Sequence, residues 1–275
     1  MEHLNWLFFD IGGTLFSETA AWNDRIRRTC EKHSISEDVF RREMCIAASK
    51  NIHEYKGALA AFDIHFGEKW NSELIAPYPV AREVLTALKK KYRLGIIANQ
   101  PLNTRKRMQE EWQLAELFDV MLISAEVGFS KPDPLLFREA LYKTGAKAHE
   151  CAMIGDKLTN DIAPAKALGF KTVWIRQEWG GMQTVTSEEL RPDITVDSLT
   201  ELLCCFGEVS KRRITSHLPR VKRSDYASAE YCWARARRFI SRCWRSIFTA
   251  RYWRRCVHLW CWSSRWALWR CFRSC

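Results

Sequence analysis

No stretch of the 275-residue chain is both long enough and free enough of charge to cross a membrane. The N-terminal apolar run is interrupted by Asp10, so it is too short for a signal peptide. The five cysteines of residues 1–210 match no metal-binding spacing, and their odd number argues against a closed set of disulfides. We therefore predict a protein without a membrane span in the reducing cytoplasm.

A second absence sets the C-terminal tail, residues 207–275, apart from the rest of the chain. From Lys211 onward there is no Gly, Asn or Gln and only one Pro, whereas seven of the 13 Trp lie there. Fifteen Arg and two Lys, set against two acidic residues, give this segment a formal charge of +15. Residues 1–210 consequently carry −4 of the net +11, so the basic character belongs to the tail.

Three hypotheses fit the tail. An Arg- and Trp-rich segment can bind nucleic acid or an anionic membrane surface, because arginine pairs with phosphate and aromatic rings stack on bases. It can also be a disordered segment that binds a protein partner. We favour a frameshift artefact, because reading a GC-rich gene out of frame favours Trp, Arg, Cys and Ser codons and removes turn residues. Functional tails usually show a pattern that matches a mechanism, and this tail has none.

The body of the chain, residues 1–206, alternates between short apolar runs and amphipathic segments. The apolar runs predict buried strands. They are residues 4–9, 94–98, 119–123, 151–154, 172–175 and 193–196. The segments between them predict helices, one of which starts with Asp133 as N-cap and Pro134 in its first turn. This order implies an α/β fold, a doubly wound parallel sheet with helices on both faces.

Residues 16–78, between the first two predicted strands, form a segment too long for a loop. A helical pattern from about Ala21 to Trp70 predicts a small cap of helices inserted into the α/β core. The core would then consist of residues 1–15 and 79–206.

Asp10 closes the first apolar run and is followed by the turn residues Gly12 and Gly13. A lone carboxylate at the end of a buried strand is costly unless something pairs with it. Ligands of parallel α/β sheets bind at the carboxyl ends of the strands. Asp10 is therefore predicted to be a nucleophile or a metal ligand.

Three further sites fall at the ends of predicted strands. They are Ala98-Asn99, Lys131 before the sequence Pro-Asp-Pro, and Asp156 with Asp161. Together with the sequence Asp-Ile-Gly-Gly-Thr from Asp10 to Thr14, these sites in this order resemble the haloacid dehalogenase-like (HAD) superfamily. The resemblance covers residues 4 to about 205 and does not include the tail. It implies a Rossmann-like core with a small helical cap.

The resemblance implies a bound Mg²⁺ ion, a hard cation that takes oxygen ligands and offsets the repulsion between a carboxylate and a phosphate. Asp10 and Asp156 would be its acidic ligands, with Asp161 either binding directly or supporting them. Gly12 would add its backbone carbonyl. Asp161 could instead only cap the helix that follows.

The resemblance also implies a two-step reaction, in which Asp10 attacks a phosphoryl group and an aspartyl-phosphate forms. Lys131 would neutralise charge on the nucleophile and on the phosphoryl oxygens. Thr14 would hold the turn, and Thr14, Ala98 and Asn99 would contact the substrate, a small phosphorylated metabolite. Asn99 could equally cap the following turn.

Gly12 departs from the superfamily pattern, in which the second residue after the nucleophile is an Asp that protonates the leaving group and then activates water. General acid–base help is worth about 10²–10⁴-fold in rate. Ala98 also departs, since Ser or Thr usually binds a phosphoryl oxygen there. We therefore expect reduced activity and a preference for acyl or aryl phosphates, whose leaving groups need little proton donation.

Two other functions stay open. The protein could be a catalytically impaired relative that binds a phospholigand or a protein partner. It could also cleave carbon–phosphorus bonds, as do relatives that have a small residue in place of the second Asp. Those relatives form an imine on a cap lysine, for which Lys50 and Lys56 are candidates. Nucleic-acid binding is expected only if the tail is genuine.

Overall fold

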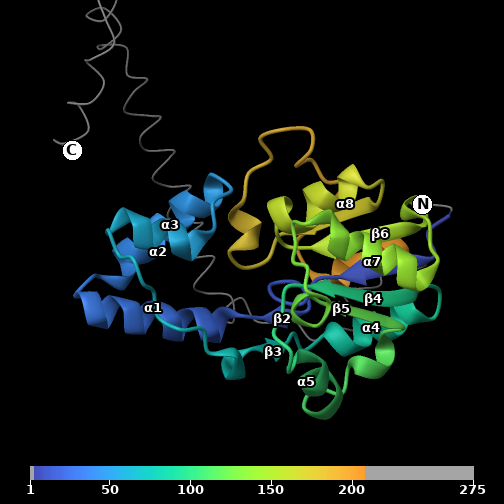
Figure 1. The fold of residues 1–275 in the computed structure, drawn as a ribbon, viewed down its shortest axis with the longest axis horizontal. Coiled ribbons are helices and arrows are strands. Elements are labelled where there is room, and N and C mark those ends of the chain that lie inside the picture. The colour runs from blue at the N-terminus through green and yellow to red at the C-terminus, as the bar shows by residue number, and fades with distance from the viewer. Residues whose placement is uncertain (1–2, 208–275) are drawn as a thin grey trace, which may run out of the picture. The chain divides into compact units, whose positions relative to one another are not determined.

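The computed structural model describes residues 3–207 and contains a six-stranded parallel sheet flanked by helices (Figure 1). The strand order is β5-β4-β1-β6-β7-β8, and every neighbouring pair is parallel. The strands are β1 (Trp6–Phe9), β4 (Arg93–Ala98), β5 (Val120–Ile123), β6 (Cys151–Gly155), β7 (Lys171–Ile175) and β8 (Ile194–Val196). The chain starts in the middle of the sheet and extends it in both directions, which confirms the predicted doubly wound α/β fold.

Alternate residues of β1 pack on opposite faces of the sheet, as expected for a strand. Leu7 and Phe9 share a hydrophobic cluster with residues of α4 (Ala81–Lys89). Trp6 and Phe8 share another with residues of α7 (Pro134–Thr144). Because helices cover both faces, every residue of β1 is buried, which explains the continuous apolar run in the sequence.

The other helices of the core are short. They are α5 (Thr104–Glu110), α6 (Ser124–Val127), α8 (Ala163–Ala167) and α9 (Leu202–Phe206). Single turns connect several elements: η1 (Ser72–Leu74), η2 (Ala115–Leu117), η3 (Ala148–Glu150), η4 (Leu158–Ile162), η5 (Gly180–Met182) and η6 (Leu199–Glu201). As predicted, Asp133 is the N-cap of α7, and its side chain accepts a hydrogen bond from the Leu135 N–H.

Three α-helices follow β1 before the chain returns to the core at α4 (Figure 1). They are α1 (Thr19–His33), α2 (Glu37–Ser49) and α3 (Glu54–Ala61). We call residues 18–75 the helical insert. Its helices bury their own hydrophobic cluster, which includes Trp22, Phe40 and Tyr55. The prediction of helix as far as Trp70 was wrong after Ala61, because Asp63 adopts a left-handed conformation that ends the helical path.

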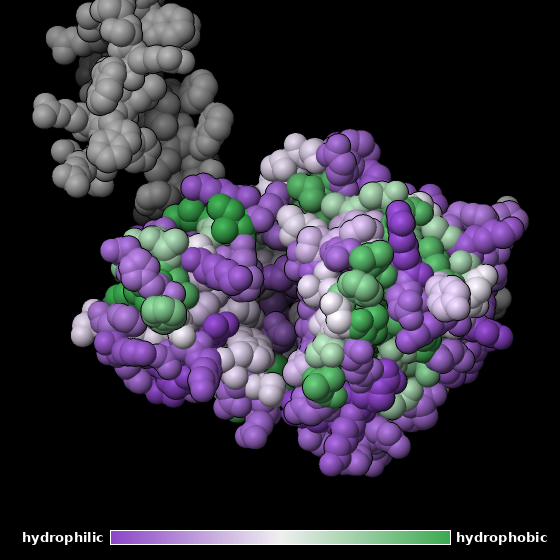
Figure 2. Space-filling model, viewed as in Figure 1, coloured by the Kyte–Doolittle hydropathy of each residue, from purple (hydrophilic) through white to green (hydrophobic). Residues whose placement is uncertain are grey.

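A two-stranded stem joins the insert to the core. Its strands, β2 (Phe16–Ser17) and β3 (Ala76–Pro77), pair antiparallel at the two ends of the insert. The insert also contacts the core directly, since Glu54 accepts a 2.9 Å ion-pair hydrogen bond from Lys157. Figure 2 shows the surface hollowed between the insert and the core, with hydrophilic residues in the hollow.

Among residues 3–207, no helix has the length and apolar character that crossing a bilayer requires. The hypotheses about the basic tail concern residues outside the described range, apart from Gly207, so they stay predictions.

Candidate active site

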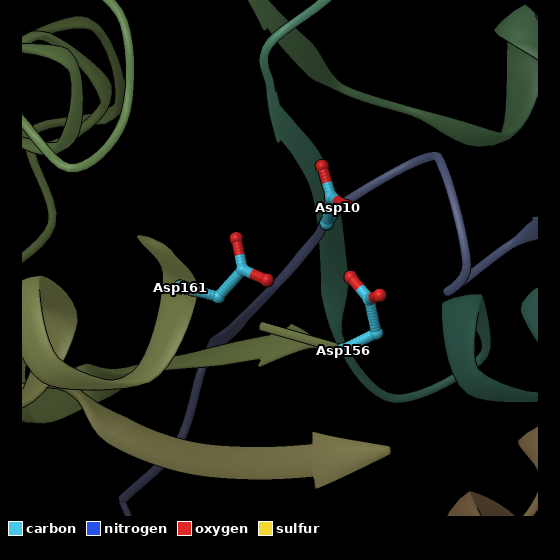
Figure 3. Close-up of side chains that lie close together, drawn as sticks. All are labelled: Asp10, Asp156 and Asp161. Atoms are coloured by element: carbon cyan, nitrogen blue, oxygen red, sulfur yellow. The ribbon is translucent and has the colours of Figure 1, made fainter. Parts of the chain in front are cut away.

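Three carboxylates meet at the carboxyl edge of the sheet (Figure 3). Asp10 follows β1, and Asp156 follows the adjacent strand β6, with Phe9 and Ile154 opposite each other in the sheet. Asp161 lies in η4, a single π-helical turn after β6. One oxygen from each lies within 4.8 Å of the others, and all three residues are buried. The parallel register thus brings together residues that are 151 positions apart in the sequence.

Lys131 lies between two of these carboxylates. Its ammonium Nζ donates hydrogen bonds to Asp10 Oδ1 and to Asp161 Oδ1, each at 2.6 Å. Burial alone would lower the pKa of Lys131, but the charges of Asp10 and Asp161 raise that pKa above its ordinary value. Lys131 is therefore a buried cation, as its predicted electrostatic role requires.

The donor set fits a hard divalent cation. Three carboxylates and one ammonium leave a formal charge of −2 in a buried site, which a cation such as Mg²⁺ would balance. Asp156 Oδ1 is buried and has no hydrogen-bond partner among residues 3–207. Burial raises the pKa of Asp156 well above its ordinary range, with the other acidic groups adding to the effect. An isolated buried carboxylate of this kind is the expected state of a ligand that lacks its metal.

Burial also raises the pKa of Asp10 to about 6, with Asp161 adding to the effect and Lys131 opposing it. The folded protein then holds a proton that the unfolded chain releases, so without metal this group's stabilising contribution is lost as the pH rises from about 4 to about 6. Mg²⁺ must displace the proton to bind, so it binds more tightly as the pH rises.

We accordingly expect Mg²⁺ to raise the Tm of the protein more at about pH 7.5 than at about pH 5. The measurement is thermal unfolding with and without Mg²⁺ at each pH, at matched ionic strength. Asp156→Asn serves as the control and should lose most of the Mg²⁺-dependent increase. An increase of equal size at both pH values would contradict the assignment of Asp10 as a ligand.

Two glycines leave room for the acidic groups. Gly13 has a φ of +66°, and a Cβ there would lie 2.6 Å from Asp156 Oδ2. A Cβ on Gly12 would lie 2.7 Å from Cδ of Glu18 and closer still to its Oε1. The carbonyl of Gly12 accepts no hydrogen bond from residues 3–207, so it stays available to a cation.

The other predicted site residues lie near the same edge but differ in what they do. Ala98 ends β4, which neighbours β1 with Ile96 opposite Phe9, and it is buried. The hydroxyl of Thr14 is buried without a hydrogen-bond partner in the described chain. Hydrogen bonds to the Ile11 carbonyl from three backbone N–H groups, including that of Thr14, hold the turn instead. Thr14 thus takes part in the turn through its backbone N–H and not through its hydroxyl, and its predicted contact with the substrate stays a prediction.

Asn99 differs from its predicted role in substrate binding. Its Nδ2 donates to the Lys131 carbonyl at 2.8 Å, and its Oδ1 accepts from the Lys131 N–H at 2.7 Å. Both polar atoms of the amide are therefore engaged by the backbone of Lys131. The sequence could not show this, because it depends on the 131 loop lying beside the end of β4.

We expect Asn99→Ala to lower kcat about 10-fold, because two hydrogen bonds that position Lys131 are lost, at roughly 1 kcal/mol each. Steady-state kinetics and thermal unfolding would measure the effect. Asn103→Ala is the matched control, since Asn103 precedes α5 without a side-chain capping bond. Equal kinetics for the two variants would contradict the positioning role.

Glu18 and Glu178 belong to the site's surroundings and were missed by sequence reasoning. Glu178 accepts hydrogen bonds from Ser17 Oγ, the Glu18 N–H, Thr19 Oγ1 and Tyr78 OH, at 2.8–3.0 Å. It thus ties the segment after β7 to the stem and to the start of α1. Burial, followed by the charge of Glu178, raises the pKa of Glu18 to about 8. No motif marks either residue in the sequence.

Glu54 is a third residue that the sequence did not identify. It is buried in the insert, and Lys157, directly after Asp156, donates to it. Burial alone would raise the pKa of Glu54, but the Lys157 charge brings that pKa below its ordinary value. The candidates for imine formation, Lys50 and Lys56, are both exposed.

Comparison with known proteins agrees with this geometry. A family model described as haloacid dehalogenase-like hydrolase matches residues 4–169. The glyceraldehyde 3-phosphate phosphatase of Pyrococcus furiosus is 27% identical over 204 residues, which cover 64% of this chain and 82% of that protein. The phosphoserine phosphatase of Thermus thermophilus is 33% identical over 126 residues, which cover 46% of this chain and 49% of that protein. A glyceraldehyde 3-phosphate phosphatase of Pyrococcus abyssi is 33% identical over 45% of this chain and 57% of its own length.

The chain thus spans about half the length of two of these relatives. Among solved structures, YfnB of Bacillus subtilis, a HAD hydrolase bound to magnesium, superposes with a TM-score of 0.55 at 19% identity. A HAD phosphatase of Thermococcus onnurineus gives 0.51 at 24% identity. The YfnB match covers 75% of this chain and 100% of YfnB, and the Thermococcus match covers 74% of this chain and 98% of that protein. Both matches support the fold. The family match, the parallel sheet and the acidic edge agree, and the chain belongs to the haloacid dehalogenase-like hydrolases.

Proposed function

We propose that the protein is a Mg²⁺-dependent phosphatase that hydrolyses a small phosphate monoester through an aspartyl-phosphate on Asp10. The buried contact between Asp10 and Lys131 carries this proposal, because it presents a carboxylate oxygen beside a fixed cation where strand ends meet. The phosphatase names of relatives with detectable sequence identity support it.

Each residue at the carboxyl edge of the sheet has its own role in the proposed reaction. Asp10 attacks phosphorus, and Lys131 lowers the repulsion between that carboxylate and the phosphoryl oxygens. Asp10, the Gly12 carbonyl, Asp156 and Asp161 would hold Mg²⁺, which would supply further charge stabilisation when bound. Asp161 keeps its place because its Oδ2 accepts a 2.9 Å hydrogen bond from the Lys157 N–H.

We further propose that residues 16–78 act as a cap over a core of residues 1–15 and 79–206. The ion pair between Glu54 and Lys157 supports this, because it joins the insert to the residue directly after Asp156. A cap that excludes water from the acidic edge would strengthen the electrostatic interactions of the site. Selectivity for a small substrate would then come from the insert, and a cytoplasmic location agrees with such a metabolite.

The test is a panel of small phosphate monoesters assayed with the full chain, with Mg²⁺ and after its removal by a chelator. We expect hydrolysis that needs Mg²⁺ and returns when the ion is restored. Failure to hydrolyse any ester, together with saturable binding of a phosphorylated compound, would instead favour the catalytically impaired binding protein. The exposure of Lys50 and Lys56 gives no support to cleavage of carbon–phosphorus bonds.

A further inference from the structure

Hydrolysis of an alkyl phosphate needs a proton donor, because the departing alkoxide is a strong base. The later attack of water on the phosphorylated Asp10 needs a base. Most ionisable groups around Asp10 are already engaged. Lys131 is held by two carboxylates, and Lys157 donates to Glu54. The proton donor must therefore be sought elsewhere.

The carboxyl group of Glu18 lies against Gly12, in the turn that follows Asp10. Its carboxyl carbon would be only 2.7 Å from a Cβ on Gly12, which is two residues after Asp10. Its carboxylate makes no hydrogen bond with any residue between 3 and 207. The carboxyl group thus lies against the turn that follows the nucleophile, and no residue between 3 and 207 forms a hydrogen bond with it.

The backbone of Glu18 is fixed although its carboxylate has no partner. Glu18 N–H donates to Glu178 at 3.0 Å, and the hydroxyls of Ser17 and Thr19 on either side donate to the same carboxylate. Glu18 is also the N-cap residue of α1, directly after β2. The group therefore sits where the core passes into the insert, so the stem sets its position relative to Asp10.

From this placement, and resting on the proposed function, we infer that Glu18 is the general acid and base of the reaction. When Asp10 Oδ forms its bond to phosphorus and the ester P–O bond breaks, the Glu18 carboxyl gives its proton to the departing oxygen, which leaves as an alcohol. Glu18 carboxylate then takes a proton from water as the water oxygen bonds to phosphorus. The Asp10 O–P bond breaks, phosphate leaves, and both side chains return to their starting states.

The same placement explains why residue 12 has no side chain. A side chain on Gly12 would displace the Glu18 carboxyl from its position beside the turn. The expectation of a preference for acyl and aryl phosphates assumed that no proton donor lies beside Asp10. With Glu18 as that donor, alkyl phosphates should be hydrolysed as well.

The test compares Glu18→Gln with the wild-type full chain in the presence of Mg²⁺. The two substrates are 4-nitrophenyl phosphate and glycerol phosphate. The amide keeps the shape of the side chain but cannot donate or accept the proton. We expect the rate of phosphoenzyme formation in the first turnover to fall about 10²-fold or more with glycerol phosphate. With 4-nitrophenyl phosphate the same rate should fall less than about 10-fold, because its leaving group needs little proton donation. Rapid-quench measurement of the first turnover separates that step from the water attack, which should also slow. Glu31→Gln, an exposed position in the same helix, is the matched control and should change neither rate.

A merely structural role for Glu18 would lower both first-turnover rates equally, and that result, or no change at all, would overturn the inference. If Glu18→Gln does not fold, Gly12→Ala replaces it, because the added methyl group displaces the carboxyl while Glu18 is retained. The same selective loss for glycerol phosphate is expected, and an equal loss for both esters would overturn the inference. Absence of turnover in the wild type would reject the proposed function itself, and the inference with it. Turnover that Asp10→Asn abolishes and Glu18→Gln leaves unchanged rejects the inference alone.

Discussion

Asp10→Asn is expected to lower turnover by about 10⁴-fold or more while the chain stays folded, because an amide cannot form the aspartyl-phosphate. The substitution keeps the shape of the side chain and leaves Lys131 its hydrogen bond to Asp161. The loss should therefore appear in kcat with little change in Tm. Steady-state kinetics on the best substrate of the panel, with acid quenching to detect the phosphoenzyme, would measure it.

Asp38→Asn, an exposed change of the same kind in α2, provides the control and should behave as the wild type. Retention of more than about a tenth of the activity by Asp10→Asn would mean that Asp10 is not the nucleophile. A metal-ligand role alone would then remain for it. If Asp10→Asn lost both its activity and its folded state, the loss of activity would come from unfolding. Thermal unfolding distinguishes this outcome from a loss of the nucleophile alone.

Lys131→Ala is expected to harm both stability and activity. It leaves Asp10 and Asp161, both buried, without the cation that they share. Breaking a buried ion pair by removing one partner typically costs about 3–5 kcal/mol of unfolding free energy. Removing one group that stabilises charge in the transition state typically costs about 10²–10³-fold in kcat.

Denaturant unfolding in the absence of Mg²⁺ would measure the first effect, and kcat in saturating Mg²⁺ the second. Lys143→Ala removes a half-exposed ion pair of α7 with Glu139 and is the control, with little expected change in either quantity. Mg²⁺ should recover part of the lost stability, since it offsets the same charges. Wild-type stability in metal-free Lys131→Ala would contradict the buried-cation assignment.

The meeting of Asp10, Lys131, Asp156 and Asp161 could be predicted from the sequence because it depends on short patterns. Each strand is an apolar run stopped by a turn, and the carboxyl ends of parallel strands reach one edge of the sheet. The functional roles of these residues are still proposals. Their proximity follows from the parallel pairing of β1 with β6. The resemblance to the superfamily implied this neighbourhood, whereas the apolar pattern alone predicts only the separate strands.

The roles of Asn99, Glu18 and Glu54 could not be predicted in this way. Asn99 looked like a substrate or turn residue, because the sequence does not show that the 131 loop lies beside it. Glu18 and Glu54 lie in the helical insert, outside every strand-end motif. Their contacts join segments that are far apart in the chain, such as the 103 residues that separate Glu54 from Lys157.

The α/β alternation and the helical insert could be predicted from the sequence alone, because apolar periodicity is a local property of the chain. The acidic edge with its lysine was predicted through the order of motifs that resembles the superfamily. The surroundings of Gly12 depend on the tertiary structure. The sequence shows a missing side chain there, whereas the folded chain brings the Glu18 carboxyl against that position. The path of the stem determines that contact, and no local pattern encodes it.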